Sequence, residues 1–543
     1  MSNKFLRGTF VLTLGTYISR ILGMIYIIPF TALVGLNGNL LYQTGYAQYT
    51  IFLSIATAGF PAAVSKYVSK YNALGDYETS RRMFKAGLRV MLLTGILAFL
   101  VLFFLAPYFA KGALSTDQLN GITVEDVTFV IRMVSTALLV VPIMSLMRGF
   151  FQGHQSMGPT AISQVIEQLV RIAFLLGATY YILKIMDGGN LVLAVGYATL
   201  AATVGAIGGL IVLMVYWLRR KNSLLAMKEN EIPAHEVSIK SIFKEVLRYA
   251  APFVFIGLAI PIYQLIDTYT FIGAMRAAGY KEIITDHYAI TVSMLPKLIM
   301  IPVSLATAFG LTLIPSVTEA FTTKNYEGLR RQIDQTLQII MFLVLPAVIG
   351  LSVLAGPAYS VFFGVKSLEL GKDILMWYAP VALLFSLFTV NAAVLQGMNK
   401  QKLAVISLVL GILVKLALNI PLIQMFQSVG SIAATALGYL VSLIYGFAMI
   451  KRHANYSYGV LIKRTFLIIA FGIFMGLTVS VTQSILDIFI TYSDGRTQSV
   501  TVLAISVIVG VAVYLYVAYR SHLLEKLFGS RILKFIPGRR REY

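Results

Sequence analysis

Cysteine is absent from this chain of 543 residues, so it has neither a disulfide framework nor thiolate chemistry. Charged residues make up only 12% of it, against roughly 25% in a typical soluble domain. Hydrophobic residues make up 58%, and the mean hydropathy is +0.80. This composition indicates an integral membrane protein rather than a soluble domain.

The residue patterns of common catalytic sites are also lacking. All five histidines fall in loops or near the ends of apolar runs, and no two have the spacing of metal ligands. No glycine-rich phosphate loop followed by lysine and a hydroxyl residue occurs, so we do not expect ATP coupling within the chain. We therefore predict no catalytic residues, no metal site and no nucleic-acid partner, and expect a transporter rather than an enzyme.

Apolar runs long enough to cross the membrane are numerous, since about 20 helical residues span its roughly 30 Å core. We count fourteen, centred near Ile21, Ile55, Leu97, Leu138, Phe174, Val204, Leu258, Ile301, Leu345, Leu384, Leu413, Leu437, Phe474 and Val507. The predicted fold class is an all-α membrane protein with 14 transmembrane helices. An even number places both termini on the same side.

Lysine and arginine are distributed unevenly between the two sides that these helices define. The chain has 44 lysine and arginine residues, of which 31 fall on the side of the termini, 7 on the opposite side and 6 within the spans. Cytoplasmic loops carry such an excess of positive charge, so we predict a plasma-membrane protein with both termini in the cytoplasm. The basic tail, residues 521–543, is expected to bind anionic membrane lipids.

Short motifs recur 244–254 residues apart. Residues 76–82 (DYETSRR) resemble 325–331 (NYEGLRR), Phe60-Pro61 resembles Ile314-Pro315, and Gln152-Gly153 resembles Gln396-Gly397. This spacing predicts two six-helix lobes of the same orientation, as in transporters built from parallel repeats. The predicted parts are an N-lobe (1–218), a cytoplasmic linker (219–243), a C-lobe (244–452), two extra helices (453–520) and the basic tail (521–543).

Arg20 lies in the middle of the first apolar run. A guanidinium there costs about 2.5–3.5 kcal/mol on insertion scales, so it should face a wet cavity or a partner. The alternative is that its long side chain reaches the interface. Lys297, in the second helix of the second half, has the same two interpretations. If both cations face a shared cavity, they form an anion site.

Asp267 and Lys415 are a second pair of charged residues inside spans of the second half, and Asn419 follows Lys415 by one helical turn. A carboxylate and an ammonium would reduce each other's cost of burial. The sequence leaves two hypotheses open: a coupling site for sodium or a proton, or a buried pair that only fixes packing.

Glu167 and Arg171 have the i, i+4 spacing of side chains that pair along one helix face. They form either a structural pair or part of a cavity wall. Arg132 and Arg148 are nearer the ends of their spans, where an interfacial position is expected.

The motif Ser19-Arg20-Ile21-Leu22-Gly23, the stretch Leu311–Ser316, the fourteen spans and the two halves together resemble one transporter family. It is the MurJ-type lipid II flippases of Gram-positive bacteria, in the polysaccharide-exporter branch of the MOP superfamily. The resemblance covers essentially the whole chain. It implies V-shaped lobes around a cationic cavity, alternating access, and a groove for the lipid tail formed by the last two helices.

The implied substrate is lipid II or a similar undecaprenyl-diphosphate-linked precursor of the cell wall. The resemblance makes Arg20 and Lys297 cavity cations, and Tyr26 stands where the family often has a second arginine; with Glu167 and Arg171 these are the predicted substrate-binding residues. Asp267 and Asn419 match a region where some relatives bind sodium, although Lys415 can replace the ion. The driving force is expected to be an ion gradient or the membrane potential.

Other functions remain open at this point. A flippase for another undecaprenyl-linked polysaccharide or a spore-cortex precursor would have the same features. A cation or drug antiporter is disfavoured because the first helix has an arginine and no carboxylate. A scaffold is disfavoured by the charges within the spans. We expect a monomer, with the machinery of cell-wall synthesis as a candidate partner.

Overall fold

The computed structural model describes most of the chain. Continuous stretches cover residues 25–57, 75–114, 121–154, 156–225 and 254–528, and short pieces cover 15, 18–19, 21–23, 64–65, 68–69, 71–72 and 118–119. These residues form two compact units, which meet in sequence between Ser293 and Met294. Almost all of the described residues are helical, in agreement with the predicted all-α class.

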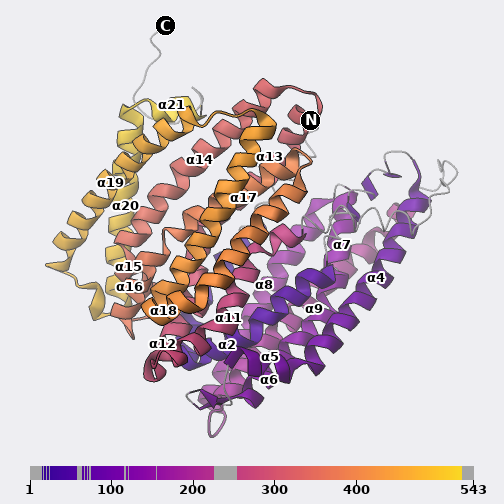
Figure 1. Ribbon diagram of the computed structural model, residues 1–543. Helices are drawn as coiled ribbons and strands as arrows, with labels where there is room; N and C mark the ends of the chain where they lie inside the picture. The colour runs from indigo at the N-terminus through magenta and orange to yellow at the C-terminus, as the bar shows by residue number, and fades with distance from the viewer. Residues whose placement is uncertain are drawn as a thin grey trace. The chain divides into compact units, whose positions relative to one another are not determined.

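The first unit contains the following elements (Figure 1): α2 (Ile27–Thr57), α4 (Tyr77–Phe104), α5 (Ala106–Leu114), β1 (Gln118–Leu119), β2 (Ile122–Thr123), α6 (Val124–Ser135), η1 (Thr136–Leu139), α7 (Val141–Gly153), α8 (Met157–Tyr180), η2 (Tyr181–Ile185), α9 (Leu191–Leu225), α11 (Ala259–Ala277), η3 (Lys281–Ile283) and α12 (Ile284–Tyr288). The π-helical segment η4 (Ala289–Met294) crosses the boundary between the units.

The second unit continues with α13 (Leu295–Thr322), α14 (Tyr326–Val353), α15 (Ala355–Phe363), α16 (Leu368–Tyr378), α17 (Val381–Gly397), α18 (Gln401–Ala454), α19 (Gly459–Asp487), η5 (Tyr492–Asp494), α20 (Arg496–Arg520) and α21 (Leu523–Phe528). Across both units, ten helices of the described chain are long and apolar enough to cross a membrane.

The helix α2 reverses direction at Gly35, where the backbone is not helical (φ 64°, ψ −162°). The rings of Phe30 and Tyr42 lie 5.2 Å apart, and the Asn39 amide donates to the hydroxyl of Thr31 at 3.3 Å. A straight helix would separate Phe30 from Tyr42 by about 18 Å, given 1.5 Å per residue. The residues before and after Gly35 are therefore two helices that fold back on each other.

We expect Gly35→Ala to destabilise the protein by about 1–3 kcal/mol, because this φ/ψ region is almost exclusive to glycine. A Cβ at residue 35 would have no neighbour within 4 Å, so the cost comes from the backbone alone. Thermal unfolding in detergent measures it. The control is Gly177→Ala inside α8, which also has open space around it, and should stabilise by about 0.5–1 kcal/mol. Equal effects at the two sites would contradict this account of the turn.

A second reversal divides α18 at Gln427, which has a positive φ of 53°. On either side of it, Ser407 and Ser442 each donate to the other's backbone carbonyl, at 2.7 and 2.8 Å. The 54 residues of α18 are therefore a hairpin of two long helices.

The repeated sequence motifs form equivalent local structures. Asp76 caps α4 by accepting from the amide of Thr79, and Asn325 caps α14 by accepting from that of Gly328, each at 2.9 Å. Such caps satisfy backbone donors that a helix start leaves unpaired. In each motif a glutamate then pairs with an arginine four residues later: Glu78 with Arg82, and Glu327 with Arg331.

The repeated glycines also make equivalent contacts, each within its own unit. A Cβ on Gly153 would lie 2.8 Å from the backbone oxygen of Ser65 and 2.8 Å from the Cβ of Val68. A Cβ on Gly397 would lie 3.1 Å from the backbone oxygen of Ile314 and 2.8 Å from the Cβ of Val317. Ser65 and Ile314 are 249 residues apart, as are Val68 and Val317. The shared contacts support the internal repeat.

The helices α19 and α20, drawn in yellow in Figure 1, pack with α14 in the second unit. Tyr514 donates to the carbonyl of Phe342 at 2.8 Å, within an apolar cluster shared by these helices. In the loop before α19, Tyr456 donates to Asp334 at 2.8 Å. Burial and this neighbouring carboxylate raise the pKa of Tyr456, so its hydroxyl stays protonated as the donor.

Candidate functional site

A cluster of polar side chains in the first unit centres on Arg171 of α8. Its Nη2 donates to the hydroxyl of Tyr46 at 2.8 Å and to that of Tyr42 at 3.4 Å. The guanidinium carbon also lies 5.4 Å from the centre of the Tyr46 ring, within the range of a cation–π contact. These partners are neutral, so they hold the guanidinium without cancelling its charge.

The tyrosines come from one face of α2, because residues 42, 46 and 49 have helical spacing. Tyr42 stacks on Tyr46 at 5.3 Å between centroids, and Tyr49 meets Tyr46 edge-on at 5.1 Å. Tyr26, across the Gly35 turn, hydrogen-bonds Tyr42. Tyr26, a predicted site residue, thus joins the cluster around Arg171 through Tyr42.

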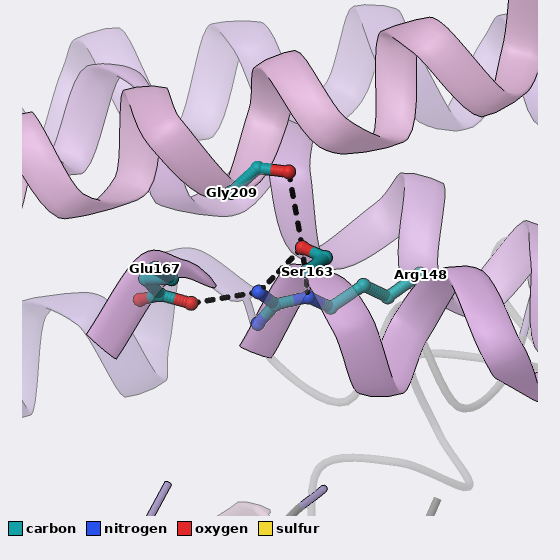
Figure 2. A network of polar contacts seen from close by, with 4 residues as sticks. All are labelled: Arg148, Ser163, Glu167 and Gly209. Carbon is teal, nitrogen blue, oxygen red and sulfur yellow. Dashed lines mark hydrogen bonds and ion pairs between the residues drawn. The ribbon is translucent and has the colours of Figure 1, made fainter. Parts of the chain in front are cut away.

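Glu167, one turn before Arg171, has a different partner (Figure 2). Its Oε2 accepts from Nη2 of Arg148 at 2.7 Å. Arg148 comes from α7, and it also donates to Ser163 Oγ from Nε at 3.2 Å and from Nη2 at 2.8 Å. Ser163 in turn donates to the carbonyl of Gly209 in α9, at 3.0 Å. The network ties three helices together.

Glycines allow α9 to approach α8 closely enough for these contacts. A Cβ on Gly205 would lie 2.7 Å from that of Arg171 and 2.8 Å from the backbone oxygen of Glu167. A Cβ on Gly209 would lie 3.1 Å from that of Glu167. Small residues bring helices together in this way in membranes.

The helix α2 also makes polar contacts with the segment that begins the second sequence repeat. Thr44 donates to the hydroxyl of Tyr288 at 3.2 Å, Gln48 donates to that of Tyr269 at 3.1 Å, and Ser293 donates to the carbonyl of Asn39 at 3.0 Å. All three contacts lie within the first unit. The sequence repeat assigns α11 and α12 to the second half, whereas contacts group them with the first.

In the second unit, Lys415 is completely buried in the α18 hairpin. Its Nζ donates to Thr435 Oγ1 at 2.6 Å and to Asn419 Oδ1 at 3.3 Å. Asn419 is one turn further along the same helix, and Thr435 comes from the other helix of the hairpin. The ammonium therefore joins the two helices through side-chain oxygens.

The other predicted site residues are more dispersed. Asp267 is 9% exposed in α11 of the first unit. Lys297 is partly buried in α13 of the second unit. Arg20 lies outside the described residues. Among the described residues, no group of three or more histidine, aspartate and glutamate side chains could hold a metal ion.

Sequence reasoning missed the roles of Arg148 and the α2 tyrosines. Arg148, expected at the membrane interface, is only 14% exposed and paired with Glu167. The i, i+4 spacing offered Arg171 as the partner of Glu167, but each binds a side chain from another helix. The helical spacing of Tyr42, Tyr46 and Tyr49 was the feature of the sequence that could have indicated a polar face on α2.

Comparison with known proteins identifies the family. Residues 5–321 match the model for polysaccharide biosynthesis proteins, and residues 265–421 match the MatE model. "Lipid II flippase MurJ" of Bacillus subtilis is 61% identical over 537 residues, which cover 98% of both chains. "Stage V sporulation protein B" of the same organism is 26% identical over 76% of this chain and 77% of its own.

Two solved structures share the fold. "Lipid II flippase MurJ, inward closed conformation" aligns with a TM-score of 0.66 and 14% identity, over 95% of this chain and 99% of its own. An inward-facing multidrug transporter of the MATE family aligns with a TM-score of 0.61 and 13% identity, over 80% and 98%. With the full-length match to the Bacillus subtilis protein, these findings show that the chain is a multi-pass membrane transporter that belongs to the MurJ family of lipid II flippases.

Proposed function

We propose that this protein moves lipid II, an undecaprenyl-diphosphate-linked peptidoglycan precursor, from the inner to the outer leaflet of the plasma membrane by alternating access. The observation that carries this proposal is the 61% identity to the Bacillus subtilis flippase over 98% of both chains. Peptidoglycan synthesis is the process served.

The described helices are compatible with fourteen spans. Ten stretches meet the criteria of length and hydropathy, and α18, which folds back on itself, accounts for two spans. The stretch Ile21–Thr57 turns at Gly35, and the apolar run before this turn continues in the sequence back to Phe10, so it also accounts for two spans. The helices α11 and α13, with 19 and 28 residues, supply two more, since 19 residues reach about 28 Å. This number, together with the excess of cationic residues on one side, supports cytoplasmic termini.

Arg171 is the described residue best suited to bind the substrate's diphosphate. Its Nε is buried and makes no hydrogen bond, while its Nη2 is aimed by Tyr42 and Tyr46. Arginine presents several donors in one plane and binds phosphate oxygens through more than one of them. Arg20 and Lys297 are the other proposed cations, by position in the sequence.

Alternating access requires contacts that can form and break. The contacts of α2 with Tyr269, Tyr288 and Ser293 are suited to this, because their polar groups can exchange protein partners for water. The amide oxygens of Asn39 and Gln48 are buried there and accept no hydrogen bond. Such unsatisfied groups lower the free energy needed to separate α2 from these residues, because water could then hydrogen-bond to the exposed amide oxygens.

The membrane potential is the proposed driving force. A potential negative inside favours export of the diphosphate by about 2.3 kcal/mol per charge per 100 mV. Lys415 supplies a fixed cation among oxygens that could otherwise hold an alkali ion, so sodium is not required. The polyprenyl tail remains in the lipid while the headgroup crosses.

Depletion of the protein in its host tests the function. We expect lipid II to accumulate on the inner leaflet and to become accessible at the outer surface again when the wild-type protein is restored. A leaflet-resolved accessibility assay measures this. Unchanged lipid II together with the loss of another surface polymer would refute lipid II as the substrate and favour a different undecaprenyl-linked glycan.

A further inference from the structure

Glu167 and Arg171 occupy positions on α8 from which oppositely charged side chains ordinarily pair. Such a pair would neutralise the charge of Arg171 within the tyrosine cluster, where that charge could otherwise bind an anion. In the structure, the carboxylate of Glu167 instead accepts from Arg148 at 2.7 Å, and Arg171 donates to tyrosine hydroxyls. Each of the two residues thus makes its close polar contacts with side chains of other helices, although they are neighbours in α8.

Arg148 is held firmly enough to maintain this arrangement (Figure 2). Two of its nitrogens donate to Ser163 Oγ, and Ser163 is itself fixed by the carbonyl of Gly209. Side-chain exposure is only 14% for Arg148 and 23% for Glu167, so water weakens the ion pair little. Glu167 therefore has a fixed, partly desolvated partner other than Arg171.

The charges in this part of the first unit then divide into two groups. Glu167 and Arg148 cancel, while Arg171 keeps a full positive charge among neutral hydroxyls. Its Nε remains available as a donor. An anion with several oxygens, such as a diphosphate, is the ligand that such a guanidinium favours.

We infer that Arg148 is a positioning residue: by binding Glu167 it prevents an internal Glu167–Arg171 ion pair and so reserves Arg171 for the anionic group of the substrate. This inference rests on the proposed function for the identity of the anion. The placement of the charges themselves does not depend on the proposed function. Loss of Arg148 should therefore inactivate Arg171 indirectly, through Glu167.

A double-mutant cycle tests the inference. We would measure binding of undecaprenyl diphosphate to the full-length protein in nanodiscs for the wild type, Arg148→Gln, Glu167→Gln and the double variant. Arg148→Gln should weaken binding about tenfold or more, the scale of one charge-assisted hydrogen bond. The double variant should bind within about threefold of the wild type, because no carboxylate remains to neutralise Arg171.

A matched control is Arg132→Gln. Arg132 is another arginine of the first unit, stacked 5.1 Å from the centre of the Phe103 ring with its Nε donating to the carbonyl of Phe103. Its replacement frees no carboxylate, so binding should be unchanged. If the double variant binds as weakly as Arg148→Gln, the role of Arg148 is only structural and the inference is refuted.

A measurement without ligand separates this inference from the proposed function. The loss of melting temperature caused by Arg171→Gln should be larger in the Arg148→Gln background than in the wild type, because a Glu167–Arg171 pair exists only there. Equal losses in the two backgrounds would refute the inference. If the difference appears but the wild type binds no undecaprenyl diphosphate, the charge placement is supported and the proposed function fails.

Discussion

Arg171→Gln is expected to lower lipid II transport by about 100-fold or more, because two or more charge-assisted hydrogen bonds to the diphosphate, each about 1.5–3 kcal/mol, would be lost. Glutamine can still bond Tyr46 but carries no charge. The measurement is the outward movement of lipid II in proteoliposomes of defined orientation. Melting temperature and the amount of inserted protein should change little, since the tyrosine partners are neutral and keep their own ring contacts.

Two further variants distinguish charge from orientation. Arg171→Lys keeps the charge but replaces the planar guanidinium with a single nitrogen, which cannot bond the tyrosines and also bind the diphosphate through several donors, so partial transport is expected. Tyr46→Phe keeps the ring below the guanidinium and removes one acceptor, so its effect should be smaller than that of Arg171→Gln. Full transport by Arg171→Gln would exclude Arg171 from the diphosphate site.

Much of the fold could be predicted from the sequence because the membrane imposes long apolar helices on any chain that crosses it. The repeated motifs were equally informative, since Asp76 and Asn325 cap helices in the same way and Gly153 and Gly397 meet equivalent neighbours. The two apolar runs centred near Leu413 and Leu437 predicted a reversal between them, but not that it falls at Gln427. A non-glycine residue with positive φ gives no local signal.

The candidate site was predictable only in part. Charged residues inside apolar runs stand out, and this identified Arg171, Glu167 and Lys415. Their partners did not stand out, because Tyr46 is 125 residues from Arg171 and the contact exists only after α2 and α8 have packed. Helical spacing suggested Arg171 as the partner of Glu167. Packing of α7 on α8 instead brings Arg148 within 2.7 Å of the Glu167 carboxylate.

The second large effect is expected at Lys415. Lys415→Ala should reduce transport about 100-fold in sodium-free buffer, the scale of a lost charged hydrogen-bonding group at a buried site. The ammonium is fully buried and bonded to Asn419 and Thr435, so its loss leaves two oxygens facing an empty volume in the α18 hairpin. Sodium, a hard cation that binds oxygen ligands, should restore part of the activity. Wild-type transport should be equal in sodium, potassium and choline.

The matched control is Lys402→Ala, which removes an exposed lysine from the start of the same helix and should leave transport unchanged in every buffer. Comparison of the two lysines separates a specific cation from a general change of charge in the second unit. Normal transport by Lys415→Ala without sodium would show that no cation is needed among these oxygens. If wild-type transport instead requires sodium, Lys415 does not replace the ion, and the driving force must include an ion gradient as well as the membrane potential.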